Sequence, residues 1–410
     1  MNTSTEPEIA AALLRDTGTI RTRANALLAR ARAGQSEWFT ISDDTALNHA
    51  AKIVADVTRE RYGDGPIPYH SRWRHFEAGG VDRRAEMNHA LSDVGIEARA
   101  RAHIDLAVVS VLLDAGAGGG WRYVEAATGQ SFSRSEGLGV ASFRAFASGL
   151  FSSNTQRPFQ ADAAGLRAVT ADQLGAAFQV SLTNPLIGLE GRVALLHRLG
   201  EALAAQPEVF GRAARPGGFF DALTKDSETV AAHDVLSLLL NTLATVWPAA
   251  NHAENVALGD CWPHRAACGA GASDGWMPFH KLSQWLTYSL IEPLKWAGVT
   301  ASGLDALTGL PEYRNGGLLL DAGVIVPKHA SSLDRTWQVG DEFIVEWRAL
   351  TVALLDELAP RVRKMLGKTE ADMPLACVLE GGTWAAGRML AQQLRGGAPP
   401  LKIVSDGTVF

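Results

Sequence analysis

The spacing of the apolar residues is the feature that most restricts how this chain can fold. Apolar residues recur three and four positions apart, as in a helix with one buried face, over 9–33, 46–61, 191–205 and 342–366. Pro360 could interrupt the last of these helices. The segment 230–246 is almost wholly apolar, which is typical of a buried helix. Strand signals are few, and the best are 401–404 and the neighbourhood of Phe132. The sequence therefore predicts a mainly α, α-rich α+β fold with a few short strands.

The chain has no obvious internal boundary. No Pro/Ser-rich linker or block of charge divides its 410 residues, of which 47% are hydrophobic. We therefore expect a single compact unit over 1–410. As an alternative within that unit, two helical lobes would comprise about 1–180 with the C-terminal part, and 181–330.

Charge and cysteine content exclude several classes of protein. The net charge is −6 and no segment concentrates Lys and Arg, which argues against nucleic acid as the main partner. Three cysteines in so long a chain do not form a disulfide framework and favour a reducing compartment. The N-terminus lacks a signal-peptide pattern, and the longest apolar run, 106–113, is short of the roughly 20 residues that span a bilayer. We expect a cytoplasmic protein without a membrane partner.

The segment 279–288 predicts the start of an amphipathic helix that carries a lysine. Pro278 stands where the first turn of a helix tolerates proline. Lys281 lies beside the apolar face, which is formed by Leu282, Trp285, Leu286 and Leu290. An apolar wall disfavours the charged form of a lysine, which is one way in which proteins prepare an amine for catalysis. The alternative is that Lys281 extends to solvent from the helix start.

The segment 310–317 predicts a second helix start, this time with a carboxylate. Pro311 suits the first helical position, which puts Glu312 in the first turn, and Gly323 is a plausible end signal. A helix N-terminus favours a carboxylate electrostatically. Because acidic residues are common in first turns, Glu312 could equally be a structural residue.

Taken together, the two segments carry a resemblance to a known group of enzymes. Phe-His-Lys-Leu-Ser-Gln-Trp (279–285) followed by Pro-Glu-Tyr-Arg-Asn-Gly-Gly (311–317) resembles the paired motifs of the queuosine 5′-phosphate nucleosidases. Those enzymes are related in fold to the helix-hairpin-helix DNA glycosylases. The resemblance implies a helical DNA-glycosylase-like architecture with Lys281 and Glu312 as catalytic residues. The acidic residue is aspartate in that group and glutamate here, one methylene longer.

A closer resemblance covers nearly the whole chain. The landmarks are 67–76 (Ile-Pro-Tyr-His-Ser-Arg-Trp-Arg-His-Phe), 110–118, 134–137, 379–388 (Leu-Glu-Gly-Gly-Thr-Trp-Ala-Ala-Gly-Arg) and the terminal 405–410. By these landmarks the chain is identified as a member of the uracil catabolism protein four family of fungi and bacteria. That family is similar to proteins of the route that opens the uracil ring after ribosylation and releases urea.

The resemblances also suggest residues that bind substrate. Asp114, before a glycine-rich turn, corresponds to an aspartate near the sugar, although an aspartate at a helix end is also routine. Arg72 and Arg74 flank Trp73 and suit a 5′-phosphate or a planar urea group, or else form surface salt bridges. The full set of expected substrate-binding residues is His70, Arg72, Trp73, Arg74, Asp114, Trp121, Glu136, Trp285, Tyr313 and Arg314.

Cys261, His264 and Cys268, with His252 upstream, are candidate ligands for a zinc ion. Their spacing is irregular for a structural site, and no second close pair completes four ligands. The glycine-rich turn 116–120 lacks both the dinucleotide-binding spacing and the Gly-Lys-Ser/Thr of a phosphate loop. We therefore expect neither a metal nor a cofactor.

The expected function is hydrolysis of an N-ribosyl bond. The resemblance implies a small ribosylated substrate, a ribosylurea or a related uracil-derived intermediate with a 5′-phosphate. One alternative is a metal-dependent amidohydrolase or ring-opening enzyme of the same route. Another is a non-catalytic protein that binds a pathway intermediate. The acidic balance disfavours direct DNA repair.

Overall fold

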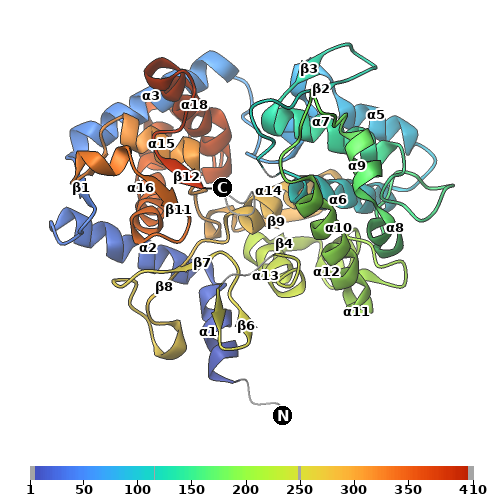
Figure 1. The fold of residues 1–410 in the computed structure, drawn as a ribbon, viewed down its shortest axis with the longest axis horizontal. Helices are drawn as coiled ribbons and strands as arrows, with labels where there is room; N and C mark the ends of the chain where they lie inside the picture. Colours follow the sequence, from blue (N-terminus) through green and yellow to red (C-terminus); the bar gives the residue numbers. More distant parts are fainter. Residues whose placement is uncertain (1–4, 115, 248–250, 405–410) are drawn as a thin grey trace.

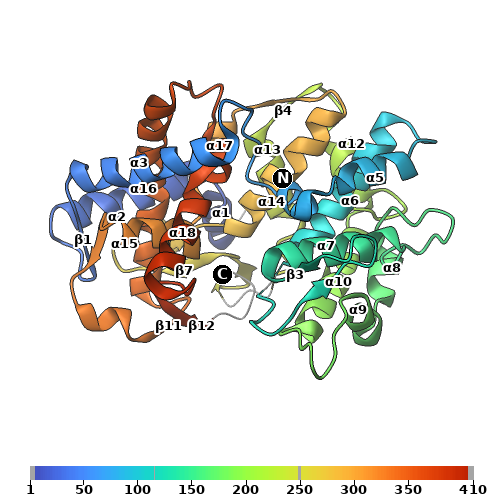
Figure 2. The same cartoon turned by 90° about the horizontal axis from the view of Figure 1, so that it is seen from above.

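A computed structural model describes residues 5–114, 116–247 and 251–404, and helices dominate it (Figure 1). The predicted mainly α class is confirmed; the more specific DNA-glycosylase-like architecture stays a prediction. The terminal motif 405–410 lies outside the described residues. Two groups of helices stand on either side of helix α14 (Lys281–Trp296), and both views show this division (Figures 1 and 2).

The first group, which we call the terminal lobe, is built from both ends of the chain. Its centre is α16 (Glu342–Leu366), which is buried over most of its length and packs against α2 and α3. Gly367, in the left-handed region at φ 65°, ends this helix. The other members are α1 (Glu6–Leu14), α2 (Thr17–Arg32), α3 (Asp44–Tyr62), α15 (Tyr313–Asp321), α17 (Leu375–Val378), the π-helical turn η5 (Leu379–Thr383) and α18 (Trp384–Arg395).

The second group, the central lobe, surrounds α6 (Ile96–Leu112), whose second half is buried on every side. Helices α7, α12 and α14 pack against α6, and α8 packs against α10. Elements on either side of residue 180 therefore lie together in this lobe. The lobe comprises α4 (Trp73–Phe76), α5 (Arg83–Ala90), α6, α7 (Arg134–Ala147), α8 (Ala163–Ala168), α9 (Ala171–Ala177), α10 (Leu189–Ala204), α11 (Pro207–Phe210), α12 (Gly218–Thr224) and α13 (Ala232–Thr242).

The strands among the described residues are short and pair only two at a time. Two pairs are parallel: β4 (Thr229–Ala231) with β9 (Thr300–Ser302), and β11 (Thr336–Gln338) with β12 (Lys402–Val404). The antiparallel pairs are β1 (Phe39–Ile41) with β10 (Ile325–Pro327), β2 (Tyr123–Val124) with β3 (Ser131–Phe132), β5 (His252–Ala253) with β6 (Val256–Ala257), and β7 (Cys261–Pro263) with β8 (Trp276–Pro278). The two strands predicted at 401–404 and near Phe132 are confirmed as β12 and β3.

Several expected helix limits are wrong for identifiable reasons. The segment 9–33 is two helices, because Asp16 accepts a hydrogen bond from Thr19 N (3.1 Å) and caps a new helix. The helix expected over 230–246 is shorter, since Val230 belongs to β4. Pro278 ends strand β8 and is not in a helix turn. Pro360 leaves α16 uninterrupted.

Candidate active site

Helix α14 places a stripe of side chains against the segment that runs from Tyr69 to Phe76. Lys281, Trp285, Ser289 and Glu292 recur every three or four positions and so lie on one side of the helix. Ser289 Oγ accepts a hydrogen bond from Arg72 N, and Ser289 O accepts one from Trp73 Nε1, both at 2.9 Å. Ser71 Oγ donates to Glu292 Oε2. These bonds fix the position of Arg72 relative to the stripe.

The start of α14 is held by a partly buried carboxylate. Asp260 Oδ2 accepts from Lys281 N at 3.0 Å, and both oxygens of Asp260 pair with Arg348 at 2.8 Å. Burial raises the pKa of Asp260, but the Arg348 guanidinium outweighs burial and holds that pKa at about 2. His280, just before the helix, has a positive φ of 50°. The Asp260–Arg348 pair thus fixes the backbone from which the Lys281 side chain extends.

Lys281 is buried, with 9% of its surface exposed. Burial lowers the pKa of its amine from 10.5 to about 8, against the opposing effect of the negative charge of Glu312. The charge of Asp114 also acts on this amine. Lys281 is therefore still protonated near neutral pH but gives up its proton more readily than an ordinary lysine.

Glu312 is the N-cap of α15. The sequence predicted it in the first turn, so the helix begins slightly later than expected. The Glu312 carboxylate accepts hydrogen bonds from Arg314 N (2.8 Å) and Asn315 N (2.7 Å). Gly323 follows the end of this helix with φ 70°, as expected. Because each carboxylate oxygen has two lone pairs, the cap leaves Glu312 able to accept further hydrogen bonds. The structural and the functional interpretation of Glu312 are therefore compatible.

Gln284 holds the start of α14 and the segment that leads to α15 in a fixed relative position. Its side-chain amide donates to Phe279 O (2.9 Å) and Thr308 Oγ1 (2.6 Å), and its oxygen accepts from Thr308 N (2.7 Å). Asn315 Nδ2 in turn donates to Leu310 O (2.9 Å). The chain that leads to Glu312 is therefore tied directly to the first turn of α14.

Arg72 and Asp114 form a third part of the site. Arg72 Nη1 lies 3.0 Å from Asp114 Oδ1, and the Arg72 side chain is completely buried. Arg72 Nε donates to Ser110 Oγ (2.7 Å), which also contacts Ser142 Oγ (2.6 Å). Asp114 directly follows the end of α6. The guanidinium of Arg72 lies 5.7 Å from the centre of the Trp285 ring.

Polar atoms without partners gather around Trp285. Within the described residues, Arg72 Nη2, His75 Nδ1 and Trp285 Nε1 are buried and have no hydrogen-bond partner. The ring centres of His75 and Trp285 are 5.7 Å apart. A buried polar group without a partner costs about 1–3 kcal/mol, so three of them in one place point to a polar ligand or to bound water.

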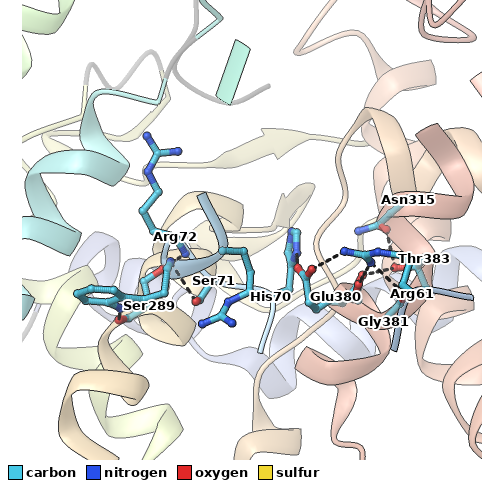
Figure 3. Close-up of polar contacts among 12 residues, drawn as sticks. Arg61, His70, Ser71, Arg72, Ser289, Asn315, Glu380, Gly381 and Thr383 are labelled. Atoms are coloured by element: carbon cyan, nitrogen blue, oxygen red, sulfur yellow. Dashed lines mark hydrogen bonds and ion pairs between the residues drawn. The ribbon is translucent and has the colours of Figure 1, made fainter. Parts of the chain in front are cut away.

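His70 also lies near Trp285, and Glu380 positions it. His70 Nδ1 lies 2.8 Å from Glu380 Oε2, and Arg61 Nη2 donates to Glu380 Oε1 at 2.8 Å. Figure 3 shows these residues together, with the Arg72 side chain directed away from them. The His70 ring lies 6.5 Å from that of Trp285 and 6.3 Å from that of Trp384.

The structure does not bring every expected residue to this place. Trp73 and Trp121 are in the core, at 1% and 0% exposure, and Trp121 Nε1 donates to Phe178 O (2.9 Å). Neither indole offers surface to a substrate in this structure. Arg74 pairs with Glu77 (3.0 Å) and Glu292 (2.9 Å). It therefore forms salt bridges, which was the alternative to binding a phosphate or urea group.

The remaining expected residues lie at one border of the site. Glu136 pairs with Arg388 at 2.8 Å. Tyr313 and Arg314 are half-buried at the start of α15, where burial raises the pKa of the Tyr313 phenol. The site therefore centres on Lys281 and Glu312, with the other groups that surround them being His70, Arg72, Asp114 and Trp285.

Residue patterns alone did not single out several groups that shape the site. Asp260 acts on Lys281 through a backbone contact 21 positions away, and no local motif marks it. His75, Glu380 and Trp384 stand inside the family landmarks, and this was the signal in the sequence that could have indicated them.

Among the described residues, no group of three or more His, Cys, Asp or Glu side chains is placed to hold a metal ion. In the same part of the chain, no helix has the length and apolar character needed to cross a membrane.

Comparison with known proteins gives full-length relatives. The chain is 39% identical to Protein urg3 of Schizosaccharomyces pombe over 401 residues, or 95% of this chain and 96% of the relative. It is 41% identical to Uracil catabolism protein 4 of Lachancea kluyveri over 412 residues, or 92% and 93% of the two chains. Residues 13–410 match the family described as "Protein of unknown function (DUF1688)". The closer of the two resemblances is thereby confirmed: the chain belongs to the DUF1688 family and is related over most of its length to Protein urg3 and Uracil catabolism protein 4.

Proposed function

We propose that this protein acts in uracil catabolism as an N-ribosyl hydrolase that releases urea from a ribosylurea or a closely related intermediate. The name of the Lachancea relative supports the pathway. The chemistry is supported above all by one observation, the buried Lys281 amine within the electrostatic reach of the capped Glu312 carboxylate. An amine with a lowered pKa is suited to donate a proton, and a fixed carboxylate is suited to stabilise positive charge.

The proposed reaction breaks the bond between the anomeric carbon and a urea nitrogen. Positive charge develops on the sugar as the bond breaks, and the Glu312 carboxylate stabilises it. The protonated amine of Lys281 gives its proton to the departing nitrogen. The oxygen of a water molecule bonds to the anomeric carbon while Glu312 takes the released proton, which then returns to Lys281. Asp114 and Arg72 would hold the ribose hydroxyls.

The test is incubation of the pure protein with ribosylurea, with and without a 5′-phosphate, followed by mass spectrometry of the products. We expect urea and the free sugar or sugar phosphate in equal amounts. Glu312→Gln and Lys281→Ala should abolish urea release while the fold remains intact. Wild-type turnover in both variants would refute the site.

A matched control separates catalysis from helix capping. Asp162 caps α8 and accepts from Gly165 N and Ser153 N, both at 2.9 Å, so its carboxylate carries two backbone bonds as that of Glu312 does. Asp162→Asn should therefore reproduce the stability cost of Glu312→Gln and retain turnover. Binding of ribosylurea without any product over long incubation would instead identify a binding protein, and ring-opened products in place of urea would identify an earlier step.

A further inference from the structure

A strongly basic cavity of about 270 Å³ adjoins the candidate active site. Among the described residues that line it are four arginines, Arg122, Arg134, Arg314 and Arg388, and none of the lining residues is acidic. Four arginines therefore border one small volume.

The two lobes contribute the arginines equally. Arg122 and Arg134 belong to the central lobe, while Arg314 and Arg388 lie on α15 and α18 of the terminal lobe. Burial lowers the pKa of Arg314, the negative charge of Glu312 opposes this effect, and the neighbouring charges of Arg134 and Arg388 lower the pKa further. Like charges brought together in this way repel, and a bound anion would relieve the repulsion.

The first turn of α7 adds to the positive potential. Ser133, at its N-cap, makes no side-chain capping hydrogen bond, and Arg134 has the unusual φ of 53°. The N-terminus of a 14-residue helix carries partial positive charge. A non-glycine residue held in the left-handed region is strained, and such strain concentrates where ligands bind.

The cavity is continuous with the candidate active site along the chain. Arg314 follows Glu312 by two residues, and its backbone N–H caps that carboxylate. Gly118 and Gly119 belong to the turn that follows Asp114. The charge of Glu136 acts on both Arg72 and Arg314. A sugar held by Asp114 and Glu312 would therefore have the four arginines at one edge of its ring.

We propose that this arginine cavity binds the 5′-phosphate of the ribosylated substrate. The assignment rests on the proposed function and deepens it, because a phosphate monoester dianion matches clustered guanidinium groups in charge and geometry. The proposal assigns the 5′-phosphate to this cavity and not to Arg72 and Arg74, which the sequence had suggested for it. Those two side chains are already paired with Asp114, Glu77 and Glu292. Of the four cavity arginines, Arg388 is paired with Glu136, whereas the other three have no ion-pair partner among the described residues.

The test is the binding of ribose 5-phosphate and of ribose, measured by calorimetry on the full-length protein. Arg122→Gln and Arg134→Gln alter exposed side chains and should leave the fold intact. Each should weaken ribose 5-phosphate binding by about tenfold or more, because a charge-assisted hydrogen bond is lost. Ribose should bind both variants as it binds the wild type. Arg335→Gln, an exposed arginine against Trp337, is the control and should change neither affinity.

Inorganic phosphate should compete with ribose 5-phosphate in the wild type and lose this effect in the Arg122→Gln/Arg134→Gln double variant. Unchanged ribose 5-phosphate affinity in the double variant overturns the cavity assignment, whatever the enzyme hydrolyses. Arginine-dependent binding in a protein that releases no urea supports the assignment and refutes the proposed function instead. The two proposals can therefore fail separately.

Discussion

Replacing Lys281 with methionine should stabilise the fold while it removes turnover. Burial lowers the pKa of the amine from 10.5 to about 8. At about 1.4 kcal/mol per pKa unit, the protonated amine costs the folded state about 3–4 kcal/mol at neutral pH. Methionine has a similar length and no charge to bury. The lost polar contacts of the amine make about 1–3 kcal/mol the expected gain.

The dependence of this gain on pH gives a sharper test than its size. Below about pH 8 the amine is protonated in both the folded and the unfolded chain, so the full cost is present. Between about pH 8 and 10.5 only the unfolded chain still binds the proton, so the wild type becomes more stable relative to the variant. Above that range the difference should vanish.

The assay is denaturant or thermal unfolding of both proteins at about pH 7 and again near pH 10. For a chain of 410 residues, the expected gain of about 1–3 kcal/mol corresponds to a rise in Tm of about 1–4 °C. Lys295→Met is the control on the same helix, since Lys295 is exposed and donates to the Tyr69 hydroxyl (2.9 Å), and it should give no gain. A Lys281→Met protein that is less stable than the wild type at neutral pH, or a difference independent of pH, would refute the reasoning.

Three further outcomes follow from the same contacts. If Lys281 is the proton donor, kcat/KM should fall as pH rises through about 8, and a flat profile of initial rates up to about pH 10 would exclude this role. Asp260→Asn should cost about 3–5 kcal/mol in denaturant unfolding, because Arg348 stays buried without its carboxylate, and adding Arg348→Met should recover part of the loss. In the wild type the contribution of Asp260 should disappear as pH falls below about 4 towards 2. Trp121→Phe removes the bond to Phe178 O and should cost about 1–3 kcal/mol with KM unchanged, whereas a raised KM would restore a role in substrate binding.

Local patterns in the sequence predicted several of the longer helices, but α6 and α7 were not among the predicted segments. The predicted limits of 342–366 coincide with those of α16, and the helix expected over 46–61 extends only two residues further at its start and one at its end. Periodicity works here because each helix buries one face or is wholly enclosed. Periodicity failed at Val230, because a short apolar run is compatible with either a strand or a helix. Here the run begins as strand β4, whose parallel partner β9 lies some 70 positions away in the sequence.

The candidate site was predictable only where its residues stand in contiguous motifs. Lys281 and Glu312 stand in contiguous motifs, so a family resemblance could indicate them, and their catalytic roles stay predictions. Asp260 depends on Arg348, 88 positions away, and no short motif records such a pair. Trp121, which the resemblance placed among the substrate-binding residues, lies in the core with 0% exposure, and the sequence alone does not distinguish a core tryptophan from one that lines a pocket.

The π-helical turn between α17 and α18 limits which changes in chain length this family can tolerate. A π turn holds one residue more than an α turn, and one residue of α-helix corresponds to a rotation of about 100°. Deleting a residue from 379–383 would therefore rotate α18 by about that angle. Gly387, whose Cα approaches the Arg314 carbonyl too closely for any side chain, would leave that contact, and Arg388 would turn away from Glu136. Relatives that keep the cavity should consequently align through this stretch without a gap, even where the individual residues differ.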